Sequence, residues 1–134
     1  MATAKINYIG DLKCEIEHIY SGTKMVTSAP LDNNGDASSF SPTDLLASAY
    51  VSCMITIIGI YCDQNKLEFN RCEASANKMM ESGPRRVAKL EIDIDLEGNN
   101  WSPDEQARII RAAEACPVAQ SVSKEMIVDI TYRF

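Results

Sequence analysis

Two of the five cysteines stand in surroundings that could make a reactive thiol pair. Cys53 lies inside the apolar run Leu45–Ile58, and Cys116 stands directly before Pro117. Thiol chemistry proceeds through the thiolate, so a nearby cation, donor or helix N-terminus decides whether such a residue reacts. If the fold brings the two together, they form a dithiol that can reduce a peroxide. If it does not, they are two ordinary buried cysteines.

The local sequence predicts different surroundings for the two thiols. A proline at the first helical position places Cys116 at the N-cap, where free N–H groups and the helix dipole stabilise an anion. We therefore expect the pKa of Cys116 to be lowered, unless this residue simply fills a corner between two helices. Cys53 lies in the middle of an apolar helix, where burial alone makes a thiol inert. It needs a nearby cation or donor to become reactive.

Hydrophobic periodicity predicts six strands and three helices in the order βββ-α-ββ-α-α-β. Alternation of apolar and polar residues marks the strands, at 5–9, 13–20, 24–28, 71–80, 86–97 and 126–134. Helices are predicted at 42–66, 103–116 and 117–124. Hairpin-type turns link most of the strands, which favours antiparallel sheets and an α+β class. At this length the chain is most simply one domain, residues 1–134.

Both long helices begin with a recognisable N-terminal sequence. Ser41 is a good N-cap before Pro42, and Asp44 suits the positive end of the helix dipole. Ser102 and Glu105 form a capping box at the start of the second helix. We expect the apolar side of that second helix to consist of Ala107, Ile110 and Ala113.

Composition excludes several classes of function. The net charge is −6 and the thirteen lysines and arginines are scattered, which excludes the clustered cations of a nucleic-acid-binding protein. There is one histidine, His18, and no CxxC motif, so no metal site is predicted, and no cofactor. The N-terminus lacks the long apolar stretch of a secretory signal, which favours a cytoplasmic location.

The uncharged stretch Leu45–Cys62 has 18 residues, a length at which a membrane span becomes a candidate. It contains Ser48, Ser52 and Gly59, and it stands alone among amphipathic strands. A helix that is apolar all round is also what a core helix covered by sheet looks like. We therefore expect a buried core helix and no membrane.

Two motifs together resemble those of the OsmC/Ohr family (osmotically inducible protein C and organic hydroperoxide resistance). The first is Ser41-Pro-Thr-Asp-Leu-Leu-Ala-Ser-Ala-Tyr-Val-Ser-Cys53-Met54, and the second is Ala115-Cys116-Pro117-Val118. The predicted order of elements also fits, so the resemblance spans nearly the whole chain. It implies an intertwined homodimer, with sheets wrapped around two long central helices and the active sites at the subunit interface.

The resemblance also implies a reaction. Cys53 matches the peroxidatic cysteine, which attacks an organic hydroperoxide and becomes a sulfenic acid. Cys116 matches the resolving cysteine, which condenses with it to a disulfide. A dithiol, commonly a lipoyl group in this family, then reduces the disulfide. The apolar surroundings suit a small apolar hydroperoxide.

The chain departs from the family pattern at the groups that activate the attacking cysteine. The peroxidases of the family carry an arginine in the N-terminal half, held by a glutamate ten residues before that cysteine. Here no arginine precedes Arg71, and Thr43 occupies the glutamate position. The substitutes available in the sequence are Lys24, His18, and the pair Arg85-Arg86.

These departures motivate a second hypothesis. The dimer could keep the fold and bind a small apolar or electrophilic ligand at its interface, without efficient peroxidase activity. Of the remaining cysteines, Cys14 and Cys72 are interpreted as packing residues in strands. Cys62 lies nine residues after Cys53, about two and a half helical turns, which is too far for a disulfide within the helix.

Overall fold

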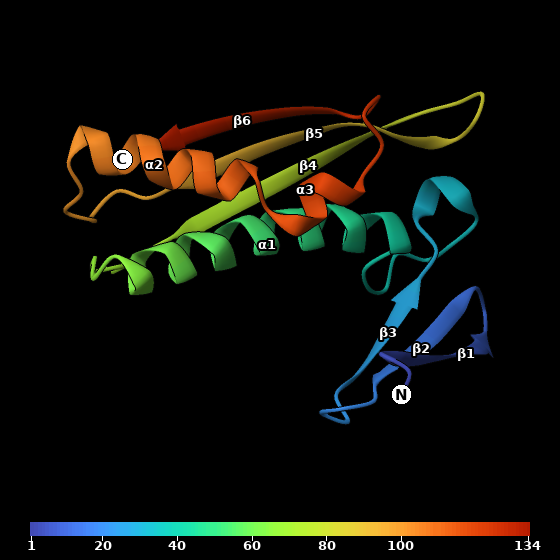
Figure 1. Ribbon diagram of the computed structural model, residues 1–134. Coiled ribbons are helices and arrows are strands. Elements are labelled where there is room, and N and C mark those ends of the chain that lie inside the picture. Colours follow the sequence, from blue (N-terminus) through green and yellow to red (C-terminus); the bar gives the residue numbers. More distant parts are fainter. The chain divides into compact units, whose positions relative to one another are not determined.

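The computed structural model describes residues 1–134 and confirms the predicted order of strands and helices (Figure 1). The N-terminal half contains β1 (Ala4–Gly10), β2 (Lys13–His18), β3 (Lys24–Ser28) and α1 (Pro42–Gln64). The C-terminal half contains β4 (Glu73–Glu81), β5 (Arg86–Asp95), α2 (Pro103–Glu114), α3 (Pro117–Ser121) and β6 (Ile127–Arg133). One short 3-10 helix, η1 (Leu31–Asn33), lies between β3 and α1. The chain forms two compact units, Met1–Leu46 and Ala47–Phe134.

The first unit is an antiparallel meander, in the order β1-β2-β3. Its pairing register aligns Ile6, Ile16 and Met25 across the three strands, so these residues share one face. Ile6 and Met25 are exposed, and none of the buried apolar residues of the chain belongs to this unit. The first unit therefore has an uncovered apolar sheet face and no hydrophobic core of its own.

The second unit contains a mixed sheet, in the order β4-β5-β6. β4 and β5 pair antiparallel, as predicted, but β5 and β6 pair parallel. The expected antiparallel pairing is therefore wrong for this pair of strands. The connection from β5 to β6 contains α2 and α3, and a helical crossover returns the chain in the parallel direction.

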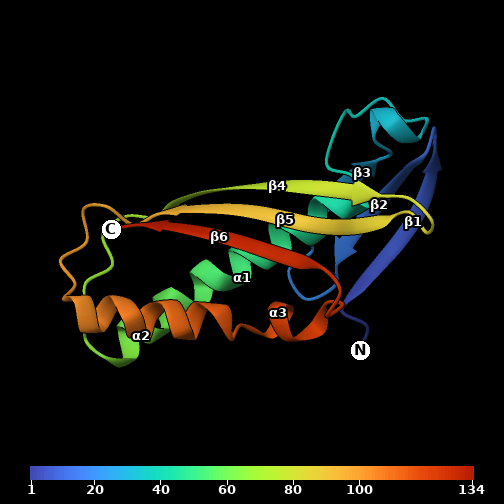
Figure 2. The same cartoon turned by 90° about the horizontal axis from the view of Figure 1, so that it is seen from above.

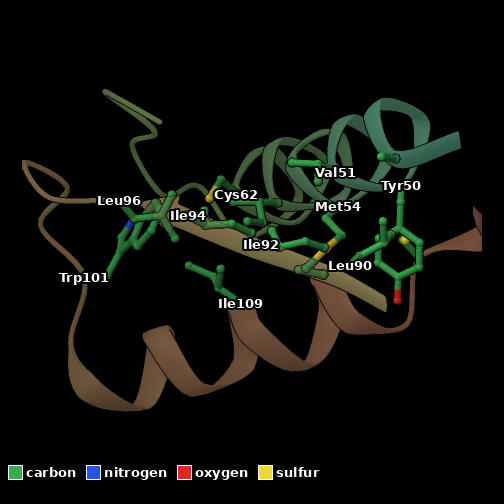
Figure 3. Close-up of a cluster of buried hydrophobic side chains, with 14 of the residues drawn as sticks. Tyr50, Val51, Met54, Cys62, Leu90, Ile92, Ile94, Leu96, Trp101 and Ile109 are labelled. Carbon is green, nitrogen blue, oxygen red and sulfur yellow. The ribbon is translucent and has the colours of Figure 1, made fainter. Parts of the chain in front are cut away.

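The hydrophobic core lies between this sheet and the helices, and α1 and α2 lie on the same face of the sheet (Figures 1 and 2). The alternation in β5 buries Leu90, Ile92 and Ile94 on that face, as predicted. Helix α1 contributes Met54, which is fully buried (Figure 3). Ile58 of the same helix is also fully buried.

Helix α1 is a core helix along one side only. By length and composition alone, this helix could cross a membrane. A third of the residues in its most apolar 18-residue segment are buried within the chain. Leu46 and Ile60 are exposed on α1. The expected all-round burial is therefore not reached within one copy of the chain.

The buried side of α2 differs from the prediction. Ile109 and Ala113 are fully buried, whereas Ala107 is exposed and Ile110 is half-buried. The buried residues on this side are Ile109, Ala113 and Cys116, which are four and then three positions apart, as a helix with 3.6 residues per turn requires. The predicted residues are three positions apart each time, and this spacing turns gradually away from the buried side of the helix.

Candidate functional site

The start of α1 is fixed by a reciprocal cap. The Ser41 backbone N–H donates to Asp44 Oδ2 over 2.9 Å, and the Asp44 N–H donates to Ser41 Oγ over 3.1 Å. Each bond satisfies an N–H group that a helix terminus otherwise leaves unpaired. The predicted cap is confirmed, and it anchors the helix that carries Tyr50 and Cys53.

Cys116 occupies the junction between α2 and α3. The predicted capping box begins α2, with the Ser102 N–H donating to Glu105 Oε2 over 2.9 Å and the Glu105 N–H donating to Ser102 Oγ over 3.2 Å. Cys116 is the N-cap of α3, as predicted, and its sulfur accepts a hydrogen bond from the Ala119 N–H over 3.5 Å.

The structure brings Cys53 and Cys116 together. Helix α3 lies beside α1 in both views of the chain (Figures 1 and 2). Cys116 is fully buried in the core cluster, and Cys53 is half-buried and packs against that cluster. The two side chains are near enough that hydrogen bonding with Cys53, and its charge, act on the Cys116 thiol. Both cysteines are free thiols in this structure.

The predicted lowering of the Cys116 pKa is wrong in direction. Burial raises the pKa of Cys116 most, and Cys53 raises it further, while hydrogen bonds from the Ala119 and Val118 backbone lower it. Helix α3 has a single short turn and therefore a weak dipole. The cost of removing the Cys116 thiolate from water therefore outweighs the stabilisation by the helix dipole.

Two tyrosines, Tyr50 and Tyr132, interact electrostatically with this thiol, and the sequence pattern did not indicate them. The Tyr132 hydroxyl donates to Glu114 Oε1 over 3.4 Å. Burial, then Glu114, Tyr50 and Cys116, raise the pKa of Tyr132. Burial, then Cys116 and Glu114, raise the pKa of Tyr50. Tyr50 lies about one turn before Cys53, which is the one sequence feature that could have indicated it.

Three of the candidate replacements for the family's arginine, Lys24, His18 and Arg86, have polar partners within their own units. Lys24 is paired with two glutamates of β2, and His18 shares a hydrogen bond with Ser21. Arg86 is paired with Glu81 and with a glutamate before β6.

The other three cysteines are free thiols as well. Cys62 is fully buried in the core, and burial raises its pKa. Burial also raises the pKa of Cys72. Cys14 is half-buried in the first unit. No group of three histidine, cysteine, aspartate or glutamate side chains is arranged to hold a metal ion.

Comparison with known proteins identifies the family. The family model described as OsmC-like protein matches residues 35–131, which include Cys53 and Cys116. The chain therefore belongs to the OsmC/Ohr family, an α+β fold class. No curated protein sequence matches this chain.

Solved structures show the same fold. A protein from Psychrobacter arcticus 273-4, described as a candidate osmotic stress induced and detoxification response protein, is 35% identical, with a TM-score of 0.93. That match covers 99% of this chain and 96% of the other. An organic hydroperoxide resistance protein OsmC from Legionella pneumophila is 17% identical, covers 100% of this chain and 98% of its own, and has a TM-score of 0.74. The organic hydroperoxide resistance protein OhrB of Bacillus subtilis is also 17% identical, with a TM-score of 0.65. That match covers 98% of this chain and 97% of the other.

Proposed function

We propose that this protein is a cytoplasmic, thiol-dependent reductase of organic hydroperoxides that acts in peroxide stress. The observation that supports it most is the meeting of Cys53 and Cys116, a half-buried thiol beside a fully buried one. Membership of a family that includes organic hydroperoxide resistance proteins supports the same substrate class.

The reaction proceeds in three balanced steps. The Cys53 thiolate attacks the terminal oxygen of the hydroperoxide, an S–O bond forms, the O–O bond breaks, and the alkoxide takes a proton and leaves as an alcohol. The Cys116 thiol then attacks the Cys53 sulfenic acid, which forms the S–S bond and releases water. A dithiol, such as a lipoyl group, reduces the disulfide by thiol–disulfide exchange and is itself oxidised to a disulfide.

The surroundings of the pair favour an apolar substrate. The core cluster that contains Cys116 also includes Tyr50, Met54 and Leu90. An alkyl or aryl hydroperoxide can bury its organic group against such a surface, whereas hydrogen peroxide cannot.

We further propose that the working form is a homodimer. Ile6, Ile16 and Met25 share the apolar face of the first unit, and that unit lacks a core. Leu46 and Ile60 leave apolar surface on α1 exposed as well. A second copy of the chain is the occupant that supplies matching apolar surface for both.

The experiment that tests the function is thiol-dependent consumption of cumene hydroperoxide and tert-butyl hydroperoxide by purified protein. We expect turnover with a lipoyl or small dithiol reductant, and its loss in Cys53→Ser. Absence of turnover with every dithiol tried would exclude the enzyme.

The absence of the family's arginine before Arg71, together with Thr43 in the glutamate position, favours one second candidate. In it the dimer binds a small apolar or electrophilic ligand at its interface and has no efficient peroxidase activity. Titrating the Cys53 thiol distinguishes the two functions, because an anionic thiol at neutral pH supports the peroxidase and a protonated thiol supports the binding protein.

A further inference from the structure

The loop between β3 and α1 contains the only Asn-Gly pair of the chain, Asn34-Gly35. Such a pair is chemically labile, because the backbone nitrogen of the second residue can attack the asparagine side chain, and glycine has no side chain to hinder the attack. Asn34 is exposed on the first unit, so water reaches it. Chemistry at this pair would be separate from that of the two thiols.

The backbone of the loop requires this pair of residues. Asn34 has a φ of 67° and a ψ of 9°, a left-handed conformation that glycine and asparagine adopt most readily. A Cβ atom added at Gly35 would lie 1.7 Å from the Ala29 carbonyl oxygen, so no side chain fits there. The loop therefore needs asparagine or glycine at position 34 and glycine at position 35, and the labile pair satisfies both needs.

The closed loop protects Asn34 from this attack. The cyclic product forms only when the Gly35 nitrogen lies beside the Asn34 Cβ, whereas a ψ of 9° places it beside the backbone nitrogen of Asn34 itself. The Gly35 N–H also donates to the Pro30 carbonyl over 2.9 Å, and the Ala37 N–H donates to the Ala29 carbonyl over 3.2 Å. Attack by the Gly35 nitrogen therefore requires the loop to open.

Surface contacts of Asp36 hold the loop closed. Asp36 Oδ2 pairs with Lys13 Nζ of β2 over 3.0 Å, and Asp36 Oδ1 accepts a hydrogen bond from the Ser38 N–H over 3.0 Å. Exposed ion pairs and hydrogen bonds of this kind contribute little free energy, so a loop that depends on them opens more often than the strands beside it.

We propose that Asn34 is a site of spontaneous deamidation that reacts when the loop 29–37 opens and then keeps the loop from closing again. The Gly35 nitrogen attacks the Asn34 Cγ, the new C–N bond forms, the Cγ–Nδ2 bond breaks, and the amide nitrogen takes the Gly35 proton and leaves as ammonia. Water then opens the cyclic imide at either carbonyl, which gives aspartate or isoaspartate. Isoaspartate makes the main chain one carbon longer, and the tight packing of Gly35 against Ala29 cannot accommodate it.

The first test compares the native full-length protein with the same protein unfolded in urea, both incubated at neutral pH. Peptide mass spectrometry locates each new carboxylate, and enzymatic methylation of isoaspartate identifies that product. We expect deamidation of Asn34 to be at least about tenfold slower in the native protein, the factor for an opening free energy of about 1.4 kcal/mol. Asn33, followed by a residue with a side chain, is the control within the same peptide. Equal rates at Asn34 in the two states, or equal rates at Asn33 and Asn34 in urea, overturn the proposal.

The second test opens the loop by substitution. Asp36→Ala removes both contacts of that carboxylate, and we expect native deamidation of Asn34 to become about two- to tenfold faster, as the loss of about one hydrogen bond implies. Asp104→Ala, the matched control, breaks an ion pair of the same 3.0 Å length with Arg108 in the second unit and should leave the rate unchanged. Equal rates in these two variants overturn the role of loop opening.

The third test asks whether the modified loop can close. Hydrogen exchange measures the Gly35 and Ala37 amides, which we expect to be protected in the unmodified protein and in Asn34→Gly, a variant that permits the left-handed backbone and lacks the amide. In protein that carries isoaspartate, both amides should lose their protection. Retained protection in that protein would overturn the proposed locking. These experiments involve neither thiols nor peroxide, so their outcome is independent of the proposed function.

Discussion

Cys53, near the middle of α1, and Cys116, at the first turn of α3, meet at the edge of one hydrophobic core. The side-by-side placement of α1 and α3 produces this meeting, and the capping residues of α1 and α2 fix where each helix begins. A half-buried and a fully buried thiol in contact form an asymmetric pair, as a reductase with separate attacking and resolving sulfurs requires.

The first prediction concerns the division of roles. Without added reductant, Cys116→Ser should consume one equivalent of cumene hydroperoxide and stop with Cys53 as a sulfenic acid, because its neighbouring thiol has been removed. Peroxide consumption and trapping of the sulfenic acid by dimedone measure this. Cys14→Ser removes a thiol from the first unit and is the matched control; it should also consume one equivalent but end as the Cys53–Cys116 disulfide, with no dimedone adduct. Equal dimedone labelling of Cys53 in the two variants would show that Cys116 does not resolve.

The second prediction concerns pH and stability. Burial raises the pKa of Cys116 in the folded chain above the unfolded value of about 8.5. The unfolded chain therefore loses this proton first, so the stability contribution is complete below about pH 8.5 and is lost as pH rises towards the folded pKa. Cys116→Ala lacks the group, and its free energy of unfolding should fall less steeply between pH 8 and pH 9.5. Urea denaturation at several pH values measures both slopes, and equal slopes would contradict the raised pKa.

The third prediction tests which side of α2 faces the core. Ile109 is fully buried, whereas Ile110 next to it is half-buried. Ile109→Ala should lower the free energy of unfolding by about 2–5 kcal/mol through lost burial and a residual cavity. Ile110→Ala, the matched control, should cost about half as much or less, since it removes less buried surface. A larger loss for Ile110→Ala would mean that α2 is rotated from its position in this structure.

The predicted positions of elements and caps depended on local features that the sequence displays directly. The alternation in β5, the Ser41 cap and the N-cap position of Cys116 are all of this kind. The parallel pairing of β6 and the raised pKa of Cys116 depend on segments that are distant in the sequence. Tyr132 is such a case, because its strand reaches the site only after α2 and α3 have crossed the sheet.

The fourth prediction concerns the dimer. Ile6→Asp places a charge on the apolar face of the first unit, whereas Asn7→Asp places the same charge on the opposite face of the same strand. We expect light scattering to show a dimer for the unmodified protein and for Asn7→Asp, and dissociation for Ile6→Asp. A charge that must be buried in an apolar contact is costly, which is the reason for the difference. Dissociation by both variants, or by neither, would contradict the proposed interface.

The most direct test of the central claim is to add one equivalent of cumene hydroperoxide to the reduced protein and map the disulfides by mass spectrometry. The account predicts one disulfide, between Cys53 and Cys116, together with one equivalent of the corresponding alcohol. Unconsumed peroxide, or oxidation at Cys14, Cys62 or Cys72 in place of this disulfide, would contradict it.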